Sequence, residues 1–359
     1  MADSDDILFG REGRVGTVLL NRPQALNAFT LGMYRQFGPK LHKFAADPAI
    51  RAVLIEGVGD RALCAGGDVR AVYEAGKGIS APREFTSIFF AEEYRIISFI
   101  HHYPKPYVAI LDGITMGGGA GVSVNGAYRI ATEKTMFAMP ETGIGLFPDV
   151  GATRFLNLCP GHIGRYLGLT GARLGAADAL YCGFVTHFVP RDRVPELKAA
   201  LVKIAWDTGA ERAQVEAVFA RFSADLGVPP LAAKRAVIDR CFAGDSVEAI
   251  LGALQSETGD PQWAQETHAA LSTKSPTSLR ITLRQLILGK GMDIEDALKL
   301  EYRMTQHCMA GHDFYEGVRA ALVDKDQKPR WRPGSLAEVD AAMTAGYFAS
   351  LGDSELTLD

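Results

Sequence analysis

Short runs of aliphatic and β-branched residues recur through the first 190 residues of the chain, and each ends in a loop rich in Gly, Asn or Asp. Apolar runs of roughly four to eight residues that end in such turn residues are typical of buried strands. The pattern therefore predicts strands in four segments: VGTVLLNRP (15–23), RAVLIEGVGD (51–60), PYVAILDG (106–113) and YRIATEKTMFAMP (128–140).

Between these runs lie longer segments whose apolar residues recur at helical spacing, such as residues 30–47 and 84–102. Strands that alternate with helices predict a layered α/β domain. After about Pro195 the spacing is helical throughout, as in VPELKAALVKIAWD, GAERAQVEAVFARF and LAAKRAVIDRCFAG. We therefore expect three parts: a core domain over residues 1–195, a helical segment over 196–275 and a helical C-terminal region over 276–359.

Two polar residues suit the N-cap position of predicted helices. Thr30 stands directly before LGMYRQF, and Ser278 stands directly before LRITLRQL. A hydroxyl at this position accepts a hydrogen bond from a backbone N–H of the first turn. Both residues are therefore interpreted as local structural elements.

Composition and charge narrow the class of protein. The chain has 359 residues, of which 47% are hydrophobic, and this is enough to build a large core. Its net charge of -4 disfavours a nucleic-acid or anionic-membrane partner. No apolar run approaches the roughly 20 residues that span a bilayer. The acidic N-terminus lacks the basic and apolar regions of a targeting peptide, so we expect a cytoplasmic protein.

Cysteine and histidine patterns give no sign of a disulfide framework or a metal site. The five cysteines are an odd number, are widely separated and include no CxxC pair. The eight histidines include no HExxH motif. We expect buried thiols and no metal.

Two glycine-rich loops, CAGGDV (64–69) and MGGGAG (116–121), each follow a predicted strand and precede a predicted helix. Their backbone N–H groups could face one anion and form an oxyanion hole. Alternatively, the glycines serve only tight turns and close packing. Neither loop matches a dinucleotide-binding fingerprint, and no P-loop motif is present, so nucleotide phosphate binding by these routes is disfavoured.

The segment PETGIGLFPDVG (140–151) places Glu141 and Asp149 in apolar surroundings, with no Lys or Arg before Arg154. If these acids are buried, their pKa values rise and one of them is poised for proton transfer or nucleophilic attack. The alternative is that one acid caps a helix and the other lies in solvent. The pattern alone leaves both interpretations open.

Six segments follow one another along nearly the whole chain: NRPQALNAF, RALCAGGDV, GITMGGGAG, MPETGIGLFPDVGATRFL, LTGARLGAADALYCGFVTHFVP and GHDFYEGVRAALVDKDQKPRW. In this order they resemble the enoyl-CoA hydratase/isomerase (crotonase) superfamily. The resemblance implies a spiral of repeated ββα units and a helical C-terminal region that completes an acyl-CoA site. It also implies an acyl-CoA substrate, no further cofactor and a homo-oligomer, either a trimer or a hexamer, although the helical segment 196–275 could block that packing.

Within the superfamily, FFAEEYR, KSPTSLRITLRQL and EYRMTQHCMAGHDFYEG resemble the branch that hydrolyses short branched 3-hydroxyacyl-CoA thioesters, as in valine degradation. The resemblance assigns the oxyanion hole to the N–H groups of Gly67 and Gly118. It assigns acids of the site to Glu141, Asp149 and Glu93. Glu141 attacks the thioester or activates a water, and both routes stay open. Asp149 and Glu93 contact the substrate hydroxyl, orient the water or protonate the leaving group.

Three alternatives accompany this assignment. Glu93 lies in a predicted helix, where a solvated surface acid is the usual outcome. The chain could also be a hydratase or isomerase of the same superfamily, but Gly121 stands where hydratases with paired glutamates carry the first acid. A non-catalytic acyl-CoA-binding protein is the third possibility. Whether the acyl group is 3-hydroxyisobutyryl or 3-hydroxypropionyl also stays open.

Overall fold

The computed structural model describes residues 5–358, which divide into two compact units. The first unit comprises the chain up to Gly67 together with Ile96–Phe137 and Arg173–Pro230. The second comprises Asp68–Arg95, Ala138–Ala172 and the chain from Leu231 onward. Each unit is assembled from separate stretches of sequence. The division of the chain at residues 195 and 275 stays a prediction.

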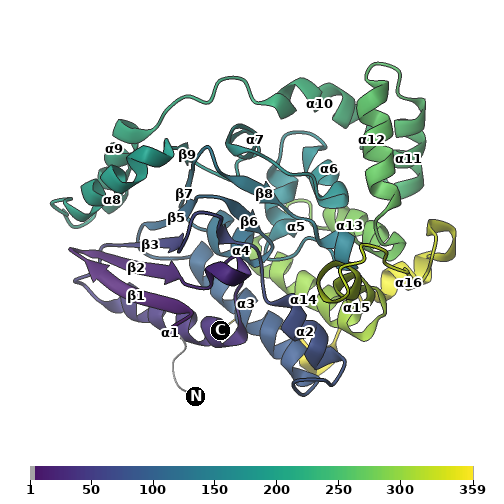
Figure 1. Cartoon of the computed structure of the whole chain (residues 1–359), viewed down its shortest axis with the longest axis horizontal. Coiled ribbons are helices and arrows are strands. Elements are labelled where there is room, and N and C mark those ends of the chain that lie inside the picture. The colour runs from purple at the N-terminus through teal and green to yellow at the C-terminus, as the bar shows by residue number, and fades with distance from the viewer. Residues whose placement is uncertain (1–4, 359) are drawn as a thin grey trace. The chain divides into compact units, whose positions relative to one another are not determined.

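A six-stranded sheet forms the centre of the first unit, in the order β1-β2-β3-β5-β7-β9 (Figure 1). Strands β1 and β2 are antiparallel, and the other neighbours are parallel. The strands are β1 (Ile7–Glu12), β2 (Val15–Leu20), β3 (Ala52–Gly57), β5 (Tyr107–Leu111), β7 (Tyr128–Ala131) and β9 (His187–Phe188). All five residues of β5 are buried, as expected for a parallel strand that is covered on both faces.

A second sheet contains three short strands in the order β4-β6-β8. They are β4 (Ala62–Cys64), β6 (Ile114–Met116) and β8 (Met136–Ala138). Along the chain, β3-β4, β5-β6 and β7-β8 are successive pairs, and each pair is followed by a helix or a helical turn. The first strand of each pair joins the large sheet and the second joins the small one. This arrangement confirms the predicted ββα repeats, and it divides segment 128–140 into two strands.

Helices α8 (Val194–Val202) and α9 (Glu211–Phe222) cover part of the large sheet. Their apolar residues, including Leu197, Leu201 and Phe219, share one core cluster with Val108 and Ile130 of the sheet. This burial accounts for the helical apolar spacing after residue 194. The other helices of the first unit are α1 (Leu31–Ala46), α4 (Gly118–Val124) and α7 (Ala176–Tyr181).

The second unit is mainly helical. Helix α3 (Glu84–His101) begins in this unit and ends in the first, and α11 and α12 lie side by side (Figure 1). The further helices are α2 (Val69–Gly76), α5 (Ala152–Phe155), α6 (Ile163–Thr170), α10 (Pro230–Cys241), α11 (Val247–Ser256), α12 (Pro261–Ser272), α13 (Pro276–Leu288), α14 (Ile294–Ala310), α15 (Asp313–Val318) and α16 (Ala341–Gly346). The helical C-terminal region is therefore confirmed.

The helix caps test two sequence predictions. Thr30 caps α1 as expected, because its Oγ1 accepts a hydrogen bond from Met33 N. Ser278 does not cap a helix, and that prediction was wrong. Helix α13 begins at Pro276, and its N-cap is Ser275, whose Oγ accepts from Ser278 N. Proline is favourable at the first helical position, so the helix starts three residues earlier than predicted.

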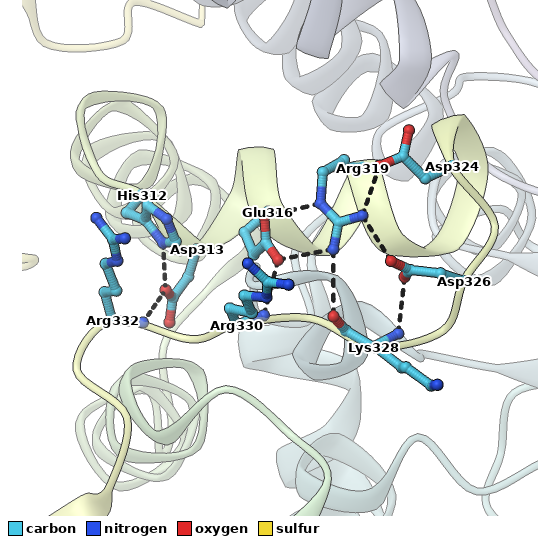
Figure 2. Close-up of polar contacts among 9 residues, drawn as sticks. All are labelled: His312, Asp313, Glu316, Arg319, Asp324, Asp326, Lys328, Arg330 and Arg332. Carbon is cyan, nitrogen blue, oxygen red and sulfur yellow. Dashed lines mark hydrogen bonds and ion pairs between the residues drawn. The ribbon is translucent and has the colours of Figure 1, made fainter.

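A network around Arg319 orders the chain after α15 (Figure 2). The Arg319 guanidinium donates to Glu316, to Asp324 at 2.6 Å and to Asp326 at 2.8 Å. It also donates to the carbonyl oxygen of Lys328 at 3.2 Å. The network holds α15 and the following loop together. Helix α15 in turn packs tightly on residues 144 and 145: an added Cβ at Gly145 would lie 2.1 Å from Asp313 O.

None of the described helices is both long and apolar enough to cross a membrane. All five cysteines are buried, and none is in a disulfide. Within residues 5–358 no group of His, Cys, Asp and Glu side chains could hold a metal ion.

Candidate active site

The two glycine-rich loops lie next to each other in the first unit. Strands β4 and β6 pair in parallel, with Cys64 opposite Thr115, and Gly67 and Gly118 each come three residues after this pair. Gly66 (φ +125°) and Gly117 (φ +48°) occupy backbone conformations that L side chains rarely adopt. The loops therefore need glycine to turn, as the structural interpretation of their sequence proposed.

Close packing explains another of the glycines. A Cβ added at Gly119 would lie 2.2 Å from the carbonyl oxygen of Cys64, which is too close for any side chain. A Cβ at Gly66 would lie 3.9 Å from Gly118 N. Gly118 is the first residue of α4, so the helix itself provides no acceptor for its N–H group. The geometry thus brings the two turns together and leaves that N–H without an intrahelical bond.

Cys64 and Asp68 have local roles in the first loop. Cys64 is fully buried, and its Sγ lies 3.2 Å from Gly66 O. Asp68 Oδ1 accepts a hydrogen bond from Ala71 N and so caps α2. This bond gives Asp68 a structural role at the start of α2.

Three acids predicted from the sequence are buried in the second unit. Glu141 (5% exposed) is the first residue of a 3-10 turn, Glu141–Ile144, and Asp149 (4% exposed) follows it on the same segment. Glu93 lies on α3 and is 3% exposed, so the surface-acid alternative for this residue was wrong. The capping alternative for the other two was also wrong, because both are buried and the N-cap of α5 is Gly151.

The Glu141 carboxyl group is strongly perturbed. Burial raises its pKa well above the usual value for glutamate, and the nearby carboxylates of Asp149 and Glu93 raise the pKa further. The charge of Lys274 acts in the opposite direction. Glu141 Oε2 is buried and has no hydrogen-bond partner within residues 5–358. A buried carboxyl group with an unsatisfied oxygen is suited to exchange a proton with a ligand.

Asp149 is held by a tyrosine that sequence reasoning missed. The Tyr94 hydroxyl donates a hydrogen bond of 2.6 Å to Asp149 Oδ2. Burial raises the pKa of Asp149 to about 6, and the hydrogen bond from Tyr94 opposes that rise. Burial and the neighbouring carboxylates keep the pKa of Tyr94 well above its usual value, so the tyrosine remains a donor.

Lys274 was also missed by sequence reasoning. It precedes α13, and its Nζ would lie 3.4 Å from a Cβ added at Gly143, two residues after Glu141. Ser275 N donates to Thr142 O at 3.2 Å and fixes the two segments together. Burial lowers the pKa of Lys274, and Glu141 raises it. Nothing local in the sequence connects these residues, because they are far apart along the chain.

Comparisons with known proteins show the family of this chain. The model of the enoyl-CoA hydratase/isomerase family matches residues 15–348. The mitochondrial 3-hydroxyisobutyryl-CoA hydrolase of Xenopus tropicalis is 46% identical over 98% of this chain and 91% of its own length. The corresponding human enzyme is 42% identical over 98% of this chain and 91% of its own length.

Two solved structures share the fold over nearly the full chain. A carnitinyl-CoA dehydratase from Mycobacterium thermoresistibile is 41% identical, with a TM-score of 0.90 and 99% of both chains covered. An enoyl-CoA hydratase from Rhodobacter sphaeroides is 38% identical, with a TM-score of 0.89, and covers 98% of this chain and 100% of its own. The sequence thus resembles named hydrolases and the fold matches structures named for hydration chemistry.

Proposed function

Because this chain belongs to the enoyl-CoA hydratase/isomerase family, we propose that it hydrolyses a short branched 3-hydroxyacyl-CoA thioester, with 3-hydroxyisobutyryl-CoA as the main substrate. The products are the free hydroxy acid and CoA. The single observation that carries the proposal is Glu141, a buried acid with a raised pKa and an unsatisfied oxygen. Relatives named as 3-hydroxyisobutyryl-CoA hydrolases match along almost the whole chain and support it.

In the proposed reaction the thioester oxygen accepts hydrogen bonds from the N–H groups of Gly67 and Gly118. These donors stabilise the negative charge that develops on oxygen more than they stabilise the ground state. Loss of one such donor typically lowers the rate by about a hundredfold to a thousandfold. Gly67 and Gly118 each follow a strand of the small sheet within three residues, which supports a shared function of their two N–H groups.

Glu141 acts in its ionised form, either as the nucleophile or as the base that activates a water. Attack by the carboxylate forms a mixed anhydride and releases the CoA thiolate, and water then hydrolyses the anhydride. Attack by an activated water forms the tetrahedral intermediate directly, with the proton passing to Glu141. Hydroxylamine or borohydride added during turnover, followed by mass spectrometry of the peptide that contains Glu141, distinguishes the routes, because only an anhydride gives a modified glutamate.

Asp149 and Glu93 complete the proposed site. Protonated Asp149 is a suitable donor to the departing thiolate, since its pKa of about 6 lies below that of a thiol near 8.5. Glu93 binds the substrate hydroxyl or orients the water. Its neighbour Glu92 is only half-buried on the same helix and provides a matched control. Replacing Glu93 with Gln is expected to lower activity, and replacing Glu92 with Gln is expected to leave activity unchanged.

Hydration of an enoyl-CoA is the second candidate, and the solved structures named for such chemistry favour it. Gly121 opposes it, since a glycine in α4 supplies no acid at the position where hydratases with paired glutamates carry one. Loss of enoyl absorbance on addition of crotonyl-CoA would support hydration. A chain that binds acyl-CoA without either reaction would be a binding protein.

The deciding experiment is CoA release from 3-hydroxyisobutyryl-CoA, followed with a thiol reagent, for wild type, Glu141→Gln and Asp149→Asn. Wild type is expected to release CoA, and both variants are expected to lose about a hundredfold or more in kcat while still binding substrate. 3-Hydroxypropionyl-CoA is the comparison substrate. Its missing methyl group is expected to change the transition-state binding free energy by about 1–3 kcal/mol, which corresponds to a change of about 10-fold to 200-fold in kcat/KM. Wild type that binds substrate but releases no CoA would reject the proposal.

Three further features belong to the proposal. The reaction uses no cofactor beyond the CoA of the substrate, so treatment with a chelator is expected to leave the rate unchanged. A trimer or hexamer is expected by light scattering, with no binding to RNA or to lipid vesicles.

We also propose a cytoplasmic location, although relatives such as the human enzyme are named as mitochondrial. Localisation of the protein in the source cells is the test.

A further inference from the structure

The turn that follows Asp149 has an unusual backbone conformation. Val150 has φ +58° and Gly151 has φ +91°, so both lie in the left-handed region. This region is unfavourable for a β-branched residue such as valine, and the surrounding structure must hold it there. Val150 is 1% exposed, and its neighbour Asp149 is one of the proposed active-site acids.

A buried glutamate holds this turn from one side. Glu301 lies on α14 and is completely buried. Its Oε2 accepts a hydrogen bond of 2.7 Å from Gly151 N, and its Oε1 accepts one of 2.8 Å from Thr153 N. Both oxygens of the Glu301 carboxyl group thus accept hydrogen bonds from backbone N–H groups that closely follow Asp149.

A buried glutamine holds the same turn from α13. Gln285 is completely buried, and its Nε2 donates to Pro148 O and to Thr153 Oγ1, both at 2.7 Å. If the side-chain amide of Gln285 were turned over, its oxygen would face the carbonyl oxygen of Pro148, and two acceptors would meet. The hydrogen-bond pattern therefore fixes which atom of the amide is the nitrogen. Gln285 and Glu301 therefore hold the chain on both sides of Asp149 and Val150.

The pKa of Glu301 depends on the charge of Asp149. Burial raises its pKa to about 8, the two backbone N–H groups oppose that rise, and the charge of Asp149 adds to it. The proposed reaction uses Glu141, Asp149 and Glu93, and it has no chemical step for Glu301. The hydrogen bonds that its two oxygens accept from Gly151 N and Thr153 N are both to the turn beside Asp149.

We infer that Glu301 and Gln285 are positioning residues for the hydrolysis: they hold Val150 and Gly151 in the left-handed conformation and thereby fix the direction of the Asp149 side chain. This inference rests on the proposed function of Asp149. A purely structural role, in which Glu301 only satisfies two buried N–H groups, is the competing explanation.

The test combines Glu301→Gln with Val150→Gly. The amide of a glutamine places a donor against one of the two backbone N–H donors and loosens the turn. We expect kcat to fall at least tenfold, with KM changed less than threefold.

Glycine adopts the left-handed conformation without help from the surrounding structure. Adding Val150→Gly to Glu301→Gln is therefore expected to restore kcat at least threefold. Glu257→Gln, which alters the ion pair of Glu257 with Arg240, is the control and is expected to leave kcat unchanged.

Two outcomes would overturn the inference: a Glu301→Gln variant whose kcat per folded molecule stays within twofold of wild type, or a double variant that recovers nothing. Hydrogen exchange of residues 149–153 separates this inference from the proposed function. If wild type releases no CoA, the proposed function fails, and the exchange still decides the positioning. Faster exchange in Glu301→Gln than in Glu257→Gln supports it, and equal exchange rejects it.

Discussion

The hydroxyl group of Tyr94 donates a 2.6 Å hydrogen bond to Oδ2 of Asp149, and both side chains are buried. A hydrogen bond to an ionised group stabilises a protein by about 1.5–3 kcal/mol, and it favours the ionised form of the acid. The pair therefore sets both the orientation and the proton affinity of an acid in the candidate site.

Replacing Tyr94 with Phe removes this hydrogen bond and leaves the ring. The pKa of Asp149 is expected to rise above its present value of about 6, because the hydrogen bond from Tyr94 now lowers it. The free energy of unfolding is expected to fall by about 1.5–3 kcal/mol. The measurements are the pH dependence of kcat/KM and urea unfolding. An unchanged pH profile would show that Tyr94 does not control the protonation of Asp149.

Replacing Lys274 with Met removes the cation that lowers the pKa of Glu141. The pKa of Glu141 is then expected to rise further. Since Glu141 acts in its ionised form in the proposed reaction, the acidic limb of the kcat/KM profile should move to higher pH. The exposed Lys290 provides the control, and its replacement with Met should leave the profile in place. A shift to lower pH, or equal shifts in both variants, would contradict this role.

Replacing Gly119 with Ala places a Cβ 2.2 Å from the carbonyl oxygen of Cys64 unless the backbone moves. The two glycine turns should separate, and CoA release should fall by about a hundredfold, the size of effect of losing an oxyanion donor. Gly252 in α11 is the matched control, because apart from its chain neighbours and the backbone of its own helix no atom lies within 4 Å of its added Cβ. There, alanine should raise stability by about 0.5–1 kcal/mol with unchanged activity. Equal activity in both variants would reject a role for this turn.

The buried acids predict the direction in which stability depends on pH. Burial raises the pKa of Asp149 to about 6 and that of Glu301 to about 8, whereas both titrate near pH 4 in an unfolded chain. Between these values the folded protein holds protons that the unfolded chain has released. Their contribution to the free energy of unfolding is therefore complete below about pH 4 and is lost as the pH rises toward 8.

Urea unfolding at about pH 5, 6.5 and 8.5 measures this dependence. In Glu301→Gln the decrease between pH 6.5 and 8.5 should be shallower than in wild type, since the variant has no proton to lose at that position. Equal decreases in the variant and in wild type would show that Glu301 is already ionised at neutral pH.

The strands, the ββα order and the glycine turns were predictable because their signals are local. Apolar runs bounded by turn residues identified β2, β3 and β5, and Gly66 and Gly117 occupy the positive-φ turns that their loops predicted. The start of α13 was missed although the signal was present: a Ser-Pro pair at residues 275 and 276 places the cap before the proline.

The partners of the acids were not predictable in the same way. Tyr94, Lys274 and Gln285 contact their partners only through tertiary packing, and no local pattern encodes those contacts. Glu301 did leave a signal. It stands at helical spacing between Leu298 and Thr305 on the buried face of α14, where a charged residue is unusual. An acid on an otherwise apolar helix face therefore indicated a buried partner.

The burial of all five cysteines makes the protein itself a second reporter in the thiol assay. A thiol reagent reacts with thiolates, and burial raises the pKa of Cys241 to about 11 and that of Cys308 further still. The folded chain should therefore contribute little background to the signal from released CoA. A variant that unfolds would expose its thiols and give a burst of colour before any substrate is added, so one reagent distinguishes a lost reaction from a lost fold.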